Sequence, residues 1–314
     1  MKHIGLFVFL AGSAAVPACD LCSIYNINVA EGTRDKGFSL SVAEQFTRFG
    51  TLQDEGDHVP NPTHQYLNSS VSQALLGYTF NDWATVQLNV PVIFREFKRP
   101  EGFMIDRGTE SGLGDISLLG NFTPVRLEQM HSTFNWSVFG GVKFPTGDSS
   151  RLKEEFNEVE FPGAPESGIH GHDLALGSGS YDGVVGTSVY GRYQRAFGNA
   201  SMQYSIRGCG DFHYRYANDL IWSGGPGALL VLNDNWTASL QLVVSGEDKG
   251  LDRFGGARAE DTGITSVYIG PQFNLTWSDK LSANVGVDIP LLLDNTALQA
   301  VPDYRIRGAL TWRF

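Results

Sequence analysis

The chain has few charged residues, few cysteines and no long hydrophobic run after its N-terminus. Only 18% of the 314 residues are charged, and 23 basic against 34 acidic side chains give a formal net charge of −11. This balance excludes the basic surface of a nucleic-acid-binding protein, so no nucleic acid is expected as a partner. No later stretch reaches the roughly 18 consecutive apolar residues of a transmembrane helix. Instead, the 37 glycines and 12% aromatic residues favour a protein of many strands and turns.

The N-terminus has the pattern of an export signal. Lys2 provides a positive charge, residues 4–16 form an apolar segment, and small residues precede a cleavage point after Ala18. An uncleaved membrane anchor is the alternative, but the apolar run is short for a span. We therefore predict a signal peptide at 1–18 that exports the protein in a Gram-negative cell.

Two cysteines follow the predicted cleavage point. Cys19 and Cys22 in "CDLC" are most simply a small disulfide in an oxidising compartment. A c-type haem is excluded because Ser23, not histidine, follows the pair. Acylation of Cys19 and a redox or metal role of the pair stay open as alternatives. Residues 19–36 are expected to form a periplasmic N-terminal segment with this CxxC pair.

From residue 37 onward, apolar and polar residues alternate with a period of two, as in "WATVQLNVPVIF" at 83–94. Successive side chains of a strand point to opposite faces, so each such stretch has one apolar and one polar face. The pattern predicts twelve strands. Their centres lie near residues 43, 73, 89, 118, 138, 188, 205, 227, 241, 270, 286 and 308.

Short and long connections alternate between these strands. Tight turns such as "FNDW" at 80–83 carry the residues that hairpins need. Long polar connections are expected at 53–66, 95–114, 146–180, 210–219, 246–262 and 292–303. Aromatic residues gather beside the short turns, which is typical of a membrane interface. They are Phe80, Trp83, Phe122, Phe134, Trp136, Phe197, Trp236, Trp277 and Phe314.

The predicted fold is all-β: a transmembrane antiparallel β-barrel of about twelve strands at 37–314 in the cell outer membrane. Only a closed barrel can expose apolar faces to lipid while pairing every backbone group. Its short turns are expected to be periplasmic and its long loops extracellular. A large soluble sandwich or propeller is the alternative. Glu44 fits badly, because the outward register of its strand places it in lipid unless a bulge shifts the register or Glu44 lies above the hydrocarbon band.

Three glycine-rich stretches carry a family resemblance. "GLGDISLLGNF" at 112–122, "GGVKFPTGD" at 140–148 and "LGSGSYDGVVG" at 176–186 resemble segments of an outer-membrane family named for the meta-pathway of phenol degradation and described as transporter-like. The resemblance extends from about residue 65 to the C-terminus. It implies a β-barrel that passes small molecules, hydrophobic ones among them, and it implies no catalytic residues. "CDLCSIY" is not part of the family's pattern.

The inward register selects candidate lumen residues. Two hypotheses are open: a basic constriction that favours anionic or polar solutes, or arginines that pair with carboxylates and merely fill a narrow barrel. The lumen-facing candidates are Lys143, Arg192, Arg207, Arg305, Arg307, Asp115 and Asp288.

The longest loop is acidic, with seven acidic and two basic residues at 148–173. His170 and His172 precede Asp173 in an H-x-H-D sequence, a pattern that can bind a divalent metal. Because an H-x-H pair in a solvated loop is a weak signal, we predict no metal site and no cofactor. An acidic rim held by divalent ions at the outer leaflet is the preferred interpretation.

No lipase or protease motif is recognisable, so the chain is not predicted to be an enzyme. The predicted function is an outer-membrane channel or transporter-like barrel for passive passage of small molecules. The alternative is a structural or complex-forming barrel whose CxxC segment docks a periplasmic redox or metal partner. The expected partners are outer-membrane lipid, a small-molecule solute and the barrel-assembly machinery, which is expected to recognise Trp312 and Phe314 at the end of the last strand.

Overall fold

The computed structural model describes residues 36–156, 161–233, 235–278 and 280–314. The predictions for the signal peptide at 1–18 and for Cys19 and Cys22 in the segment 19–36 lie outside these residues.

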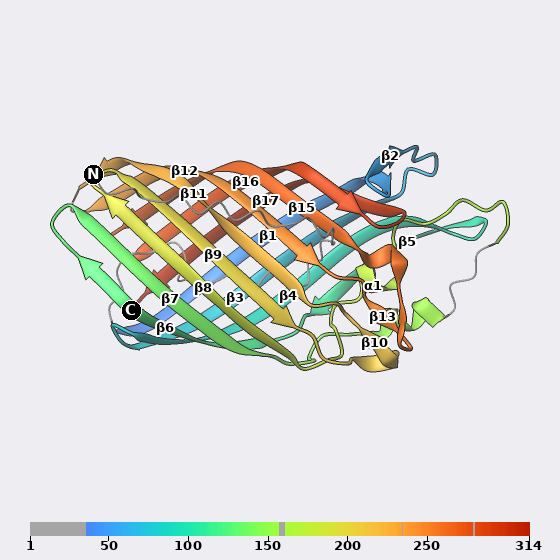
Figure 1. The fold of residues 1–314 in the computed structure, drawn as a ribbon, viewed down its shortest axis with the longest axis horizontal. Coiled ribbons are helices and arrows are strands. Elements are labelled where there is room, and N and C mark those ends of the chain that lie inside the picture. The colour runs from blue at the N-terminus through green and yellow to red at the C-terminus, as the bar shows by residue number, and fades with distance from the viewer. Residues whose placement is uncertain (1–35, 157–160, 234, 279) are drawn as a thin grey trace, which may run out of the picture.

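Twelve strands form a closed antiparallel barrel (Figure 1). Each pairs with the next along the chain, and the last pairs with the first from Ser39↔Arg313 to Gln53↔Gln299. The predicted fold and strand number are confirmed. The barrel strands are β1 (Gly37–Asp54), β3 (Tyr66–Asn81), β4 (Ala84–Glu101), β6 (Ser117–Glu128), β7 (Ser132–Lys143), β8 (Asp182–Tyr193), β9 (Ala196–Ile206), β11 (Asp219–Leu232), β12 (Trp236–Lys249), β15 (Ile264–Trp277), β16 (Leu281–Asn295) and β17 (Gln299–Arg313).

The two-residue alternation explains why the barrel is apolar outside and polar inside. On β4, Val92 and Phe94 are exposed, whereas Ile93 and Arg95, which alternate with them, are buried. The same alternation runs along the other walls, so outward side chains are mainly apolar and inward ones mainly Ser, Thr, Asn, Gln or charged. Closure gives each of the twelve barrel strands two neighbours, so the barrel wall has no open edge. An exterior of this kind is stable in lipid.

The two ends of the barrel differ. The C-terminus lies at the end with the short turns, and the small elements lie at the other end (Figure 1). No described helix is long and apolar enough to cross a membrane. The small elements are β2 (Asp57–Val59), β5 (Met104–Leu113), η3 (Ser150–Phe156), α1 (Gly171–Leu174), η4 (Asp211–His213), β10 (Tyr214–Arg215), β13 (Arg253–Phe254), β14 (Ala257–Arg258) and η5 (Glu260–Thr262).

Two of the long connections expected from the sequence are strands for most of their length. At 95–114, β4 continues and pairs with β5 from Val92↔Leu113 to Glu101↔Met104. At 292–303, β16 and β17 continue as strands, although they pair with each other only from Leu281↔Trp312 to Asp288↔Arg305. These stretches mix polar and apolar residues without a regular two-residue alternation, so their sequence resembles a loop. Strands at this end need no continuous apolar face where they extend beyond the hydrocarbon.

Glu44 keeps the outward register of β1. The pairing of β1 with β3 is continuous from Gly37↔Thr79 to Phe49↔Leu67, and the irregular positions opposite β17 lie between Arg48 and Thr51. A bulge at Glu44 is therefore wrong. The carboxylate instead accepts hydrogen bonds from the hydroxyls of Ser70 and Ser72 on β3, which satisfy it on the outward face.

Candidate functional site: the lumen and its plug

The barrel encloses a cavity of about 200 Å³. Its walls are rich in side-chain amides from inward positions, and several bond to one another. The Gln241 amide donates to the Asn199 side chain at 2.7 Å, and the Asn89 amide donates to that of Gln73 at 2.9 Å. Gln203 and Gln272 also face this space. The lining therefore offers uncharged donors and acceptors.

Two predicted lumen arginines of β17 lie beside this cavity and contact carboxylates. Arg307 forms a close pair with Asp288 of β16, with Nε 2.5 Å from Oδ2. Arg305 lies 4.0 Å from Glu247 of β12, and its guanidinium carbon is 4.0 Å from the ring centre of Tyr268. The positive charges at this level of the lumen are therefore balanced locally.

A second charged cluster lies towards the end of the barrel with the long loops. Lys143, the last residue of β7, is 3.0 Å from Asp115 and 2.8 Å from Asp182. Arg207 is 2.8 Å from Asp182 and 2.5 Å from Asp219. All five side chains are buried. Such groups are costly to desolvate unless they are paired, and here each has an opposite charge in contact.

Asp115 links this cluster to the longest loop. It lies in the break between β5 and β6 and accepts hydrogen bonds from the backbone of Gly147 and from both the backbone and the hydroxyl of Ser178. Arg192, the remaining predicted lumen residue, is half-buried near the short-turn end. Its guanidinium donates to the carbonyl of Gln194 and to the hydroxyl of Thr133.

The described parts of loop 144–181 fold into the mouth at the long-loop end of the barrel, and we call them the plug. Arg95 of β4 donates from Nη1 to the backbone carbonyls of Asp173 and Ala175, the latter at 2.7 Å. Ile169 and Leu174 of the plug pack against Leu67 and Phe97 of the barrel wall. The buried Arg95 side chain therefore binds this segment to the barrel wall. Because the docked segment occupies the mouth, it narrows the lumen.

Gly168 allows the plug to approach the wall. The Ala300 backbone donates to its carbonyl at 2.7 Å, and its own amide donates to the Gln65 side chain at 2.9 Å. A Cβ at this position would lie 2.9 Å from the Ala300 nitrogen and 2.8 Å from Leu52. A larger residue would push the plug away from β17.

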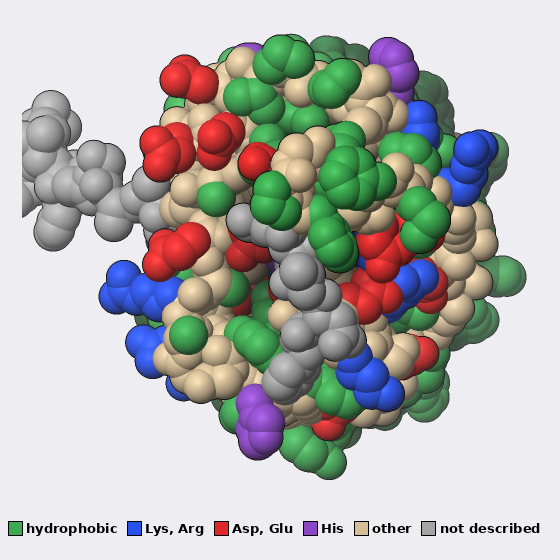
Figure 2. Space-filling model, turned by 90° about the vertical axis from the view of Figure 1, so that its right-hand side faces the viewer, with side chains coloured by type: hydrophobic (Ala, Val, Ile, Leu, Met, Phe, Trp, Pro, Cys, Tyr) green, Lys and Arg blue, Asp and Glu red, His purple; other side chains and the backbone are tan. Residues whose placement is uncertain are grey.

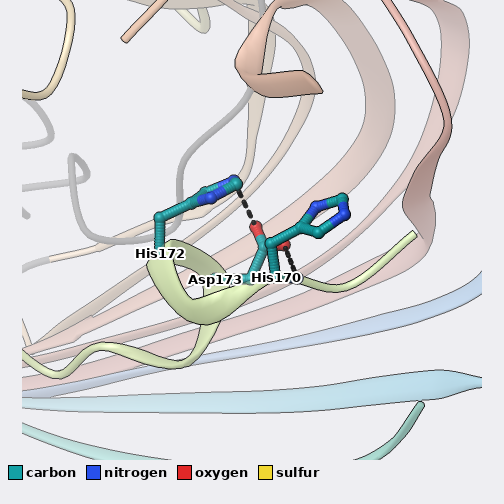
Figure 3. A group of neighbouring side chains, drawn as sticks. All are labelled: His170, His172 and Asp173. Carbon is teal, nitrogen blue, oxygen red and sulfur yellow. Dashed lines mark hydrogen bonds and ion pairs between the residues drawn. The ribbon is translucent and has the colours of Figure 1, made fainter. Parts of the chain in front are cut away.

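His170 and His172 are buried inside the mouth, so the expectation that they lie in a solvated loop is wrong. Figure 3 shows the Asp173 carboxylate between the two rings. Burial alone would raise the pKa of Glu155, but the nearby His172 lowers the pKa of that carboxyl to about 2. Burial opposes protonation of His172, yet Asp173 and Glu155 raise its pKa well above the usual value.

The predicted acidic rim is a mixed surface in the structure. Figure 2 shows acidic side chains around the mouth with Lys and Arg among them and hydrophobic side chains between. Some acidic side chains of the loop form ion pairs with arginines. Glu154, for example, contacts Arg99 at 2.6 Å and also pairs with Arg151.

Sequence reasoning missed several lumen residues, namely Arg95, Asp182, Asp219 and Glu247. Each occupies an inward position of its strand, so the alternation that selected Lys143 contained the signal for their direction. Their partners were not readable, because those lie on other strands or in the plug.

No protein-family model and no curated protein matches the chain. A solved outer-membrane channel shares its fold. An outer membrane channel from Pseudomonas putida F1 is 13% identical with a TM-score of 0.59, and the match covers 93% of this chain and all of that one. The translocator domain of the autotransporter NalP from Neisseria meningitidis is 11% identical with a TM-score of 0.42 over 90% of each chain. The first likeness, together with the closed barrel, establishes an outer-membrane β-barrel and confirms the predicted location.

Proposed function

We propose that the chain forms an outer-membrane channel for the passive passage of small uncharged solutes. The observation that carries this proposal is the amide-rich lumen cavity of about 200 Å³ inside a closed barrel. A channel needs a path that water and solute can wet, and the inward Gln and Asn side chains provide one. The likeness to a solved outer membrane channel supports the same function at the level of fold.

The charge arrangement favours uncharged over anionic solutes. Of the predicted lumen cations, Lys143, Arg207, Arg305 and Arg307 each lie within 4.0 Å of a carboxylate. An arginine that is paired with a carboxylate attracts a passing anion only weakly, because the two opposite charges largely cancel. Of the two hypotheses drawn from the sequence, ion pairing within the barrel is the one these distances support.

The plug sets the upper limit on solute size. It occupies the mouth and contacts β3, β4 and β17, so solutes must pass beside it or wait for it to move. We infer slow passage of small molecules rather than free flow. We also infer that the chain acts without catalysis, that 1–18 is its signal peptide, and that the Cys19–Cys22 segment is periplasmic.

Liposome swelling tests this function. The purified barrel is inserted into liposomes and challenged with uncharged solutes of increasing size, from glycerol to disaccharides. We expect swelling with the smallest solutes and a cut-off as size increases. Heat-denatured barrel is the control for leakage. Swelling no faster than the denatured control, for every solute, would contradict the channel proposal.

Planar bilayers give an independent measurement. We expect small conductance steps and weak preference between potassium and chloride, as the paired lumen charges require. A strong chloride preference would contradict the neutral lumen, although it would leave the channel function standing.

A further inference from the structure

Three separate segments bring potential metal ligands together where the plug meets the connection between β12 and β15. Glu155 comes from η3, and His170, His172 and Asp173 come from α1 and the residue that precedes it. Asp261 comes from η5, in the connection between β12 and β15. Ligands that converge from such distant positions are stronger evidence for a metal site than the H-x-H-D sequence alone.

The atoms of this cluster lie at separations that suit metal coordination. His170 Nδ1 is 3.2 Å from Asp261 Oδ2, and His172 Nε2 is 3.5 Å from Asp173 Oδ1. Two ligands bound tetrahedrally at 2.0–2.2 Å are about 3.4 Å apart. The ligand atoms of His170, His172 and Asp173 all lie within 4.8 Å of one another, as do those of Glu155, His172 and Asp261. The wider separations can shorten by rotation of the side chains.

His172 is held in an orientation that leaves one ring nitrogen for a ligand. Its Nδ1 lies 3.0 Å from Glu155 Oε1, which also accepts the His172 backbone amide at 2.7 Å. A carboxylate on one imidazole nitrogen is the usual outer partner of a metal-binding histidine. The His172 ring also stacks on Tyr214, with 6.2 Å between centres. Its Nε2 points towards the Asp173 carboxylate (Figure 3).

Close packing of the backbone places the two histidines. Gly171 separates them, and a Cβ there would lie 2.4 Å from the Arg151 carbonyl of η3. Only glycine permits this approach, which brings Glu155 of η3 next to His172 of α1. The sequence H-G-H therefore fixes the contact between the two short helices.

The site has space beside it and an excess of negative charge. A cavity of about 40 Å³ is lined by His172 and Asp173, enough for about one water molecule or ion. The basic residues at this cavity are engaged elsewhere: Lys249 pairs with Asp252 at 2.8 Å, and Arg95 binds plug carbonyls. Three carboxylates face two imidazoles in the cluster, so a divalent cation would reduce the net charge.

We propose that the plug binds one divalent transition-metal ion through His170, His172, Asp173 and Asp261, with Glu155 orienting His172. Two imidazoles and two carboxylates match zinc and its neighbours, whereas magnesium and calcium prefer all-oxygen sites. The ion fastens loop 144–181 to the connection between β12 and β15, and so stiffens the plug. This site is independent of whether solutes cross the lumen.

Calorimetric titration of the full-length barrel in detergent, stripped of metal, tests the proposal. We expect one zinc ion per chain with a dissociation constant in the micromolar range or below, and no comparable binding of magnesium. Replacing Cys19 and Cys22 with serine removes the CxxC thiols as alternative ligands, and zinc binding should persist in that background. Loss of binding in the serine background, or equal binding of magnesium, would overturn the site.

Matched substitutions locate the ion. His170→Ala and His172→Ala should abolish the zinc signal, and Glu155→Gln should weaken binding about 10- to 100-fold. His131→Ala is the control, because His131 is exposed in the β6–β7 turn at the other end of the barrel. Cobalt bound to the wild type should give visible absorption bands that Glu155→Gln shifts while circular dichroism shows an intact barrel. Zinc binding that is unchanged in both alanine variants would refute the proposal.

Discussion

Replacing Arg95 with alanine is expected to release the plug from the barrel wall. Arg95 is only 2% exposed, and its guanidinium donates to the carbonyls of Asp173 and Ala175. A hydrogen bond from a charged group contributes about 1.5–3 kcal/mol. Loss of both bonds should therefore destabilise the docked plug by at least about 3 kcal/mol.

This loss is large enough to detect in single channels. Because 1.4 kcal/mol is a tenfold change in an equilibrium constant, the ratio of docked to released plug should fall roughly 100-fold or more. The apolar contacts of Ile169 and Leu174 remain, and the substitution removes no pairing between barrel strands. The barrel should stay folded while its mouth opens more often.

Planar-bilayer recording measures the effect. We expect more frequent or larger openings for Arg95→Ala than for the wild type, and faster swelling of liposomes with solutes near the size limit. Arg126→Ala serves as the matched control, because Arg126 lies beside the short β6–β7 turn and contacts Glu128 there. If Arg95→Ala folds and conducts like the control, the plug does not govern passage and the reasoning fails.

Three further predictions concern the C-terminus, the lumen and the orientation of the barrel in the membrane. Deleting Phe314, which stacks on Trp312 with 5.2 Å between ring centres, should lower surface levels in cells more than folding in detergent; wild-type surface levels would count against an assembly signal. The double variant Arg305→Ala, Arg307→Ala should shift ion preference towards cations, because it removes the two positive charges that face Glu247 and Asp288, and an unchanged reversal potential would contradict the pairing. Cys209 is free and exposed between β9 and β11, so a membrane-impermeant maleimide should label it on intact cells; labelling of Asp82→Cys in the β3–β4 turn instead would reverse the assigned orientation.

The barrel wall was predictable because lipid imposes one simple pattern on it. An outward position in the hydrocarbon must be apolar and its neighbour must face the lumen, so alternation such as Leu40, Ser41, Val42 is visible in a single sequence. Each predicted centre falls within one of the twelve barrel strands. Turn residues then gave the connectivity, since neighbouring strands in such barrels are consecutive.

The constraint weakens where the strands rise beyond the lipid. In β5, "MIDRGTESGL" has polar residues on both faces, so nothing in it distinguishes a strand from a loop. Its pairing comes from β4, which it meets directly after the turn at Gly102. The composition of β5 alone therefore cannot predict that the segment pairs with β4, because this pairing results from the hairpin turn between them.

The sequence indicated which side chains face the lumen, but it did not indicate their ion-pair partners. The inward register identified Lys143 and Arg207, yet their shared contact is Asp182, which belongs to a strand that begins only after the plug. His170 and His172 were interpreted as solvated because their loop is acidic. Their burial depends on the fold of the plug, where Arg95 and Gly168 join it to distant strands.

These contacts imply that passage depends more on the plug than on fixed lumen charge. Arg305 and Arg307, which line the cavity, already face carboxylates, so their removal changes the charge of the bore but not the segment that fills its mouth. Arg95 instead holds the segment that fills the mouth. Passage of uncharged solutes should therefore respond strongly to Arg95→Ala and weakly to the double arginine variant. The opposite order would mean that the lumen arginines, not the plug, form the main barrier.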